Sequence, residues 1–298
     1  MLHGYTQSMR RARERVARVP SHRFSSDFGD TEYVDEGTGP AVLLAHGIYG
    51  GHDNATDMVE VVLGPGYRTI GPSRFGYFGS SIPADPTVEG QAGAYVKLLD
   101  HLGISKVIAV GYSAGGPSAI ALALNHPARL YGLVLAAAYL PKPGAIPDLV
   151  KPAMRWALGA QPLWWLLRVT APRLLGRIMG VPKGYRPTTD EHAVVDDIME
   201  HLFPISEKKA GAIFDTLVSE PASNSYPLEN LAVPVLLVHA PDDPLAGYRY
   251  AEQAADRIPG AQLATIPRGG HLFLGTVPDV HAATRRFATR VGASPADS

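Results

Sequence analysis

Short apolar runs alternate with segments of helical periodicity along most of the chain. The runs are rich in valine, leucine, isoleucine and alanine, as is typical of buried strands, and they lie at Ala41–Ala45, Tyr67–Gly71, Lys106–Val110, Leu130–Ala136, Val233–His239 and about Ala261–Ile266. Helical patterns between and after them lie near Asp53–Leu63, Val88–Leu102, Gly116–Asn125, Tyr248–Ile258 and Pro278–Arg290. Strands that alternate with helices at this spacing predict an α/β fold with a mostly parallel, doubly wound sheet.

The N-terminal region departs from this alternation. The segment His22–Glu36 alternates weakly around Gly29-Asp30, which predicts an antiparallel hairpin at an edge of the sheet. The first 20 residues carry five arginines between Arg10 and Arg18 but no long apolar run, so they do not resemble a secretory signal. We expect a basic helical arm that packs on the protein's own surface or on a neighbour.

The alternation also stops after Leu140. The segment from residue 141 to residue 227 contains helical patterns and no strand pattern. We therefore predict three parts, namely a first part of the core over residues 1–140, a helical cap insertion over 141–227, and a second part of the core over 228–298. The insertion contains Trp156, Trp164 and Trp165, which fit either the lining of a substrate pocket or an ordinary hydrophobic core.

Composition narrows the classes of function. The chain has 298 residues, of which 46% are apolar, and its 27 basic and 28 acidic residues give a net charge of −1. This balance gives no electrostatic reason to expect nucleic acid or an anionic membrane as a partner. The absence of cysteine excludes disulfides, thiolate metal sites and a cysteine nucleophile. No apolar run approaches the length of a membrane span, so we expect a soluble, cytoplasmic protein and leave open whether it forms a homo-oligomer.

The strongest chemical motif is Gly111-Tyr112-Ser113-Ala114-Gly115, which joins the strand Lys106–Val110 to a helix of small residues. A strand that turns at once into a helix forces its corner residue into a strained conformation, and residues without a Cβ are needed on both sides. This motif is typical of a nucleophile elbow, in which the Ser113 hydroxyl projects above the sheet.

A serine hydroxyl needs a base, and the base needs a group that orients it. After the next predicted strands come Asp242 and Asp243, and then His271 on a glycine-containing loop. The carboxyl ends of parallel strands share one edge of a sheet, which is where such sheets hold their sites. The order serine, acid, histidine is itself typical of one lineage of serine hydrolases.

With these motifs the sequence resembles the α/β-hydrolase superfamily, in its small-esterase and haloperoxidase-like branch with an inserted cap. The resemblance covers roughly residues 32–140 and 232–288. It implies that Ser113 is the nucleophile, His271 the general base and Asp243 the acid. The family's acid usually stands three residues after a His-Gly pair, and here the pair reads His239-Ala240, which favours Asp243 over Asp242.

The resemblance also assigns an oxyanion hole. The backbone N–H of Ala114 follows the nucleophile directly, and His46-Gly47-Ile48 resembles the family's H-G-x element, which makes the N–H of Ile48 the second donor. No cofactor and no metal are implied.

Other polar residues receive structural interpretations. We interpret His46 as a structural hydrogen-bonding residue, His239 as a satisfied core histidine, and the loop Arg74–Tyr77 as a packing element. The remaining histidines singled out are expected to be exposed, namely His52, His126, His201 and His281.

The sequence thus predicts a serine hydrolase that cleaves a small, apolar ester through an acyl-serine intermediate. A serine at position 113 argues against dehalogenases and epoxide hydrolases, which use an aspartate nucleophile. Three alternatives stay open: a carbon–carbon bond hydrolase, a cofactor-free haloperoxidase or perhydrolase, and a small-molecule receptor that keeps the triad.

Overall fold

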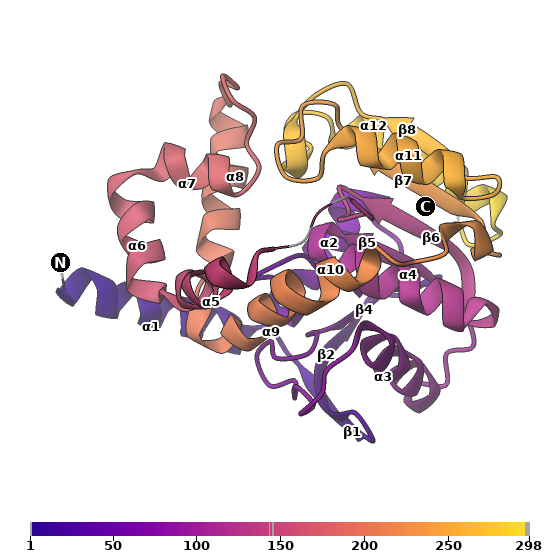
Figure 1. Ribbon diagram of the computed structural model, residues 1–298, viewed down its shortest axis with the longest axis horizontal. Coiled ribbons are helices and arrows are strands. Elements are labelled where there is room, and N and C mark those ends of the chain that lie inside the picture. Colours follow the sequence, from indigo (N-terminus) through magenta and orange to yellow (C-terminus); the bar gives the residue numbers. More distant parts are fainter. Residues whose placement is uncertain (1, 143, 145, 296–298) are drawn as a thin grey trace.

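A single eight-stranded sheet runs through the centre of the computed structural model, which describes residues 2–142, 144 and 146–295 (Figure 1). The strand order is β1-β2-β4-β3-β5-β6-β7-β8. The strands are β1 (His22–Ser26), β2 (Gly29–Glu36), β3 (Ala41–Ala45), β4 (Arg68–Pro72), β5 (Val107–Tyr112), β6 (Leu130–Ala136), β7 (Val235–His239) and β8 (Gln262–Thr265). Strands β3 to β8 pair in parallel, whereas β1 and β2 form an antiparallel hairpin at one edge. The predicted mostly parallel sheet and edge hairpin are confirmed.

Helices cover both faces of this sheet because alternate strand residues point in opposite directions. In β5, Val107 and Ala109 belong to the hydrophobic cluster on one face, and Ile108 and Val110 belong to the cluster on the other. The first cluster is completed by α3 (Val88–His101), α4 (Gly116–Asn125) and α11 (Tyr248–Arg257). The second is completed by α2 (Ala55–Leu63) and α12 (Val277–Arg290). The doubly wound arrangement is therefore confirmed.

The chain between β6 and β7 is helical, and none of its described residues forms a strand. Its helices are α5 (Lys151–Gly159), α6 (Gln161–Thr170), α7 (Pro172–Ile178), α8 (Thr189–His201), α9 (Lys209–Phe214) and α10 (Glu220–Ser223). We call these helices and their connections the helical insertion. The boundaries 141 and 227 stay a prediction, and residues 1, 143, 145 and 296–298 of the predicted parts lie outside the described residues.

The basic N-terminal arm forms helix α1 (Leu2–Arg18), which packs on the helical insertion. Met9 and Ala12 are buried against it, and the indole Nε1 of Trp165 donates a hydrogen bond to Ser8 Oγ at 3.1 Å. The Arg15 guanidinium donates to two backbone carbonyls at the end of α8, at 3.0 and 2.7 Å. The arm therefore packs on the protein's own surface, which is one of the two predicted positions.

None of the helices formed by the described residues combines the length and the hydrophobicity that a bilayer-spanning segment requires.

Candidate active site

The turn between β5 and α4 has the strained geometry that its sequence predicts. Ser113 has φ +51°, in the left-handed region that residues with a Cβ rarely adopt. A Cβ added at Gly111 would lie 2.8 Å from that of Ala119, and one added at Gly115 would overlap the backbone of Ala45. The two glycines are therefore required for the helix and the neighbouring strand to approach this corner. The predicted strained corner is confirmed.

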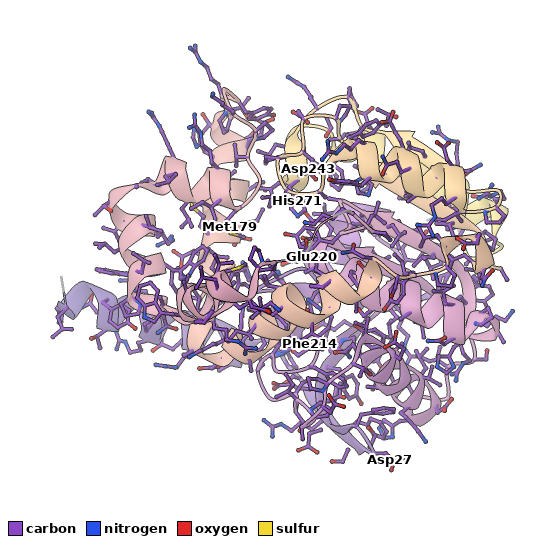
Figure 2. The ribbon with its side chains drawn as sticks, in the orientation of Figure 1. Asp27, Met179, Phe214, Glu220, Asp243 and His271 are labelled. Carbon is purple, nitrogen blue, oxygen red and sulfur yellow. The ribbon has the colours of Figure 1, made fainter. Side chains whose placement is uncertain are left out.

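The structure brings Ser113, His271 and Asp243 together from three separate strand ends. Ser113 Oγ lies 2.8 Å from His271 Nε2, and His271 Nδ1 lies 2.8 Å from Asp243 Oδ2. A carboxylate can only accept, so the ring proton resides on Nδ1 and leaves Nε2 free to accept from the serine hydroxyl. All three side chains are buried. Figure 2 shows His271 and Asp243 beside one another, between the sheet and the helical insertion.

The two adjacent aspartates after β7 make different contacts. Asp243 Oδ2 faces the imidazole, while its Oδ1 accepts from the backbone N–H groups of Leu245 and Ala246 at 2.8 and 3.0 Å. The Asp242 carboxylate instead accepts from the backbone N–H groups of Gly269 and Gly270 at 3.1 and 3.0 Å. Asp242 therefore holds the histidine loop rather than the ring.

The loop after β3 lies directly against the serine. A Cβ at Gly47 would stand 3.2 Å from the Cβ of Ser113, so this loop approaches the nucleophile corner as closely as glycine allows. His46 holds the loop: its Nδ1 lies 2.8 Å from Gly47 O, and its Nε2 accepts from the backbone N–H of Arg74 at 3.0 Å. Burial, and then the nearby Arg74 charge, lower the pKa of His46 well below its usual range, so it is neutral. These contacts agree with its structural interpretation.

The two predicted oxyanion donors belong to two segments that meet at Ser113. Ala114 is buried in the short helical turn that begins at Ser113, and Ile48 follows Gly47 in the adjacent loop. Ile48 also lines the same cavity as Ser113.

A cavity of about 690 Å³ lies over the serine and the histidine, between the carboxyl ends of the strands and the helical insertion. Its lining is mostly apolar, with Met179 and Leu158 from the insertion and Ile48 and Leu272 from the core among the residues that form it. Figure 2 shows Met179 on the insertion side, facing the region of His271. Four carboxylate residues also line it, of which Asp57, Asp190 and Asp197 are exposed, and no described lysine or arginine does.

The three tryptophans have three different environments. Trp164 lines the cavity and packs edge-on against Tyr49, with ring centroids 5.5 Å apart. Trp165 is core, buried against Tyr5 and Ser8 of α1. Trp156 neither lines the cavity nor belongs to the core, because 67% of it is exposed. The pocket interpretation is therefore wrong for Trp156 and Trp165, since the helix that carries each residue turns it away from the cavity.

Two tyrosines beside the triad were not singled out by the sequence. The Tyr112 hydroxyl donates to the backbone carbonyl of His271 at 2.7 Å. The Tyr139 N–H donates to the Ser113 carbonyl at 2.8 Å, and its ring centroid lies 6.4 Å from that of His271. Both residues line the cavity. Their position was visible in the sequence, because Tyr112 directly precedes Ser113 and Tyr139 follows the neighbouring strand β6.

Several histidine interpretations need correction. His52 is buried and its Nδ1 lies 3.0 Å from Ser73 Oγ, while His201 is partly buried and lines the cavity, so neither is exposed. His126 and His281 are also partly covered. His239 is buried as expected but is not satisfied, because neither ring nitrogen has a hydrogen-bond partner among the described residues. Burial lowers the pKa of His239 to about 4.

The loop after β4 forms a buried ion pair in addition to its packing contacts. Arg74 is fully buried and donates two hydrogen bonds of 2.5 Å to the carboxylate of Asp215, on the helical insertion. The Tyr77 hydroxyl donates to the same carboxylate at 2.5 Å. The loop is thus a buried joint between the core and the insertion.

No three histidine, aspartate or glutamate side chains gather in a metal-binding arrangement within residues 2–142, 144 and 146–295.

Comparison with known proteins identifies the family. A model of the alpha/beta hydrolase fold matches residues 40–173, and a model of a TAP-like protein matches residues 216–294. The "Uncharacterized hydrolase YcgS" of Bacillus subtilis (strain 168) is 31% identical over 259 residues, which cover 83% of this chain and 90% of that protein. The chain belongs to the α/β-hydrolase family.

Solved structures of other α/β hydrolases superimpose on this one over most of its length. The alpha/beta hydrolase fold protein from Nakamurella multipartita has a TM-score of 0.69 at 25% identity and covers 92% of this α/β hydrolase and 100% of that chain. The esterase EaEST from Exiguobacterium antarcticum has a TM-score of 0.70 at 20% identity and covers the same shares. At this identity the second likeness concerns the fold alone.

Proposed function

We propose that this protein is a serine hydrolase that cleaves carboxylic ester bonds through a covalent acyl-serine intermediate. The observation that carries the proposal is the continuous contact from Ser113 Oγ to His271 Nε2 and from His271 Nδ1 to Asp243, with 2.8 Å at each step. A serine, a base within hydrogen-bond reach and a carboxylate that orients the base are the parts that acyl transfer requires.

In the acylation step, Ser113 Oγ attacks the ester carbonyl carbon while its proton moves to His271 Nε2. Asp243 accepts a hydrogen bond from Nδ1–H and stabilises the imidazolium that forms. The carbonyl oxygen becomes an oxyanion, and we assign its stabilisation to the N–H groups of Ile48 and Ala114. Each such donor typically contributes about 3–4 kcal/mol to transition-state stabilisation. Collapse of the tetrahedral intermediate breaks the C–O bond, and the imidazolium gives its proton to the leaving alcohol.

Deacylation repeats these steps with water. His271 Nε2 takes a proton from a water molecule, whose oxygen attacks the acyl carbon, and the proton is then returned to Ser113 Oγ as the acid leaves. The close packing of Gly47 against Ser113 supports this arrangement, because it brings the loop of Ile48 to the reacting carbon.

The substrate class follows from the cavity. We propose that residues 141–227 act as a cap over a binding site for an uncharged, apolar acyl group. The apolar lining and the absence of a lining lysine or arginine among the described residues support this choice. Carboxylates in the lining would repel an anionic substrate, namely those of Asp57, Asp190, Glu191 and Asp197.

A comparison of kcat/KM for a butyrate ester and the matched hemisuccinate ester tests this substrate class. The neutral butyrate ester should have the higher value, and equal values would contradict the proposal.

The test of the proposed chemistry is Ser113→Ala. Removal of the nucleophile should lower kcat for an aryl ester by about 10⁶-fold, because the other triad members cannot act without it. Labelling of the wild-type protein at Ser113 by a fluorophosphonate, with none in the variant, would locate the reaction. An unchanged rate in Ser113→Ala would refute the proposal. Hydrolysis that stops after one turnover would instead indicate a receptor that retains the triad.

A further inference from the structure

Charge is unevenly distributed along this nearly neutral chain. Residues 149–189 contain no aspartate or glutamate but carry seven basic residues: Lys151, Arg155, Arg168, Arg173, Arg177, Lys183 and Arg186. Within the described part of the chain, Lys151 pairs with Asp148 and Arg168 with Glu200, whereas the other five are exposed and lie in no salt bridge. Helices α5 to α7 and the loop after them therefore carry five exposed basic side chains outside any ion pair, whereas the acidic residues of this region lie on the next helix, α8.

The same helices expose large apolar side chains. Leu149 is 91% exposed, Trp156 67% and Val169 56%. Leu163, Leu166 and Val169 follow one another at intervals of three residues, so they form a stripe along one side of α6. Leu174 lies one turn before Ile178 on α7, and both are exposed. Large exposed apolar side chains gathered on neighbouring helices are typical of interaction sites, whereas singly scattered ones are not.

Helix α1 extends this surface. It packs on α6 through Trp165, and it carries Arg10, Arg11 and Arg18 as exposed side chains. Figure 1 shows α1, α6 and α7 at one end of the molecule, well apart from α12. Basic and apolar groups are thus collected at a single end.

We propose that helices α5 to α7, with α1 beside them, bind an anionic lipid surface. Exposed arginines attract acidic phospholipid headgroups, while tryptophan and leucine enter the boundary between headgroups and acyl chains. The combination favours a lipid surface over nucleic acid, because nucleic acid offers charge but no layer into which isolated leucine side chains could insert. The inference goes beyond the proposed hydrolytic step and does not depend on it.

The location of this surface relates it to the cavity. Ile178 and Val194 line the cavity and are themselves exposed, so the apolar surface of α7 continues to the cavity's edge. The carboxylates of α8 that line the cavity, Asp190, Glu191 and Asp197, would repel the same lipid headgroups, so we place the lipid contact on α5 to α7 and α1, beside the cavity rather than over it.

The test uses the full-length protein and vesicles of phosphatidylcholine, with and without phosphatidylglycerol. We expect co-sedimentation with the mixed vesicles at low salt, weaker binding at high salt, and little binding to phosphatidylcholine alone. Arg173→Glu/Arg177→Glu reverses two charges four residues apart on α7 and should lower the partition coefficient about tenfold or more, since each basic residue near such a surface contributes appreciably. Trp156→Ser should also weaken binding.

The matched control is Arg286→Glu/Arg290→Glu, which reverses two exposed arginines with the same spacing on α12. It should bind as the wild type does, and far-ultraviolet circular dichroism checks that all variants are folded. Equal losses in both double variants, or equal binding to neutral vesicles, would overturn the proposal. So would the absence of binding to the mixed vesicles at low salt, and a dimer in solution or binding to nucleic acid would then identify another occupant of the surface.

Discussion

Two adjacent aspartates support His271 in different ways, because Asp243 contacts its ring and Asp242 contacts the two glycines that precede it. Asp243 contacts the ring and is itself held by the N–H groups of Leu245 and Ala246, so its carboxylate has one orientation. Asp242 accepts from two successive N–H groups, of Gly269 and Gly270, immediately before the histidine. Under the proposed mechanism, one carboxylate sets the tautomer and the other sets the loop.

This division predicts different effects of the same substitution. Asp243→Asn should lower kcat by about 10⁴-fold, because an amide no longer selects the correct tautomer or stabilises the imidazolium. Asp242→Asn keeps one acceptor oxygen and loses one of two backbone hydrogen bonds, so kcat should fall by no more than about 10²-fold, since one such bond is worth about 1–3 kcal/mol. Steady-state hydrolysis of an aryl ester measures both. A larger loss in Asp242→Asn would contradict the assignment of the acid.

His239 makes stability depend on pH. Its pKa falls from 6.5 to about 4 in the folded state, because the buried ring must stay neutral. The unfolded chain therefore binds more protons between these values, and the free energy of unfolding decreases as pH falls from 6.5 toward 4. Replacing the ring by leucine removes this loss, which is on the order of 3 kcal/mol. Urea unfolding of wild type and His239→Leu at several pH values checks it. Parallel pH profiles would refute this role of His239.

Residues whose environment is set by their immediate neighbours were predictable from the sequence, whereas others were not. The strained Ser113 and its two glycines follow from the strand-turn-helix pattern alone, because the required geometry is local. Asp242 and Asp243 are equivalent by position, and only the family resemblance favours one. His52 and His201 were expected to be exposed, since their burial depends on segments that are distant in the sequence.

At the scale of elements, the loop after α7 touches the histidine loop directly. The His271 N–H donates to the Gly180 carbonyl at 3.2 Å, and the Tyr185 hydroxyl donates to the Leu274 carbonyl at 3.1 Å. A Cβ added at Gly180 would stand closer to His271 Cβ than the 3.0 Å that real Cβ atoms respect. The helical insertion thus contributes to the position of the imidazole.

Two glycines in this loop give a matched experiment. Gly180 and Gly184 both have positive φ, at +104° and +81°, so alanine strains the backbone at either position. Only at Gly180 does the new methyl group meet His271, since nothing lies within 4 Å of a Cβ at Gly184. We expect Gly180→Ala to lower kcat by about tenfold or more through the displaced base, because a shift of about 1 Å can cost about 10²-fold.

Gly184→Ala should retain nearly the wild-type kcat, with a smaller fall in melting temperature, because it has the backbone strain without the clash. The rate at which the fluorophosphonate labels Ser113 separates the two explanations, because a displaced His271 activates the serine less well, whereas a general loss of stability leaves the rate of the folded protein unchanged. Equal kcat values in the two variants would show that the loop does not position the base.

Element boundaries were predictable where they depend on local signals. The runs Ala41–Ala45 and Leu130–Ala136 form β3 and β6 with the predicted bounds. Both are short apolar runs, and the first also follows Gly39-Pro40 directly. Residues 151–178 of the helical insertion are divided among three helices, α5, α6 and α7, which the predicted helical insertion did not separate. Each has a proline in its first turn, Pro152, Pro162 or Pro172, where the missing N–H costs nothing. That spacing is present in the sequence and could have been used.

On the scale of the whole molecule, two buried ionic joints hold the core and the helical insertion together. Arg74 and Tyr77 of the core meet Asp215 of the insertion. Lys208 of the insertion is fully buried and donates to the Tyr49 carbonyl at 2.7 Å, with Asp53 of the core 3.7 Å away. Arg74 and Asp215 are 141 residues apart, so no local pattern could pair them.

These joints predict that the core and the insertion unfold together and that the Arg74–Asp215 pair is costly to break on one side only. Asp215→Leu leaves the Arg74 guanidinium buried without its partner, so the free energy of unfolding should fall by about 3–5 kcal/mol. The triple variant Arg74→Met/Tyr77→Phe/Asp215→Leu removes every member of the joint and replaces it by apolar groups of similar volume. Because the desolvation cost of both charges is then avoided, most of that stability should return.

Urea unfolding, followed by far-ultraviolet circular dichroism and by tryptophan fluorescence, measures the stability of both variants. The fluorescence reports on the insertion alone, since all three tryptophans lie there. Coincident transitions are expected in each protein, and a triple variant no more stable than Asp215→Leu would mean that the ion pair itself, rather than its filled volume, stabilises the junction.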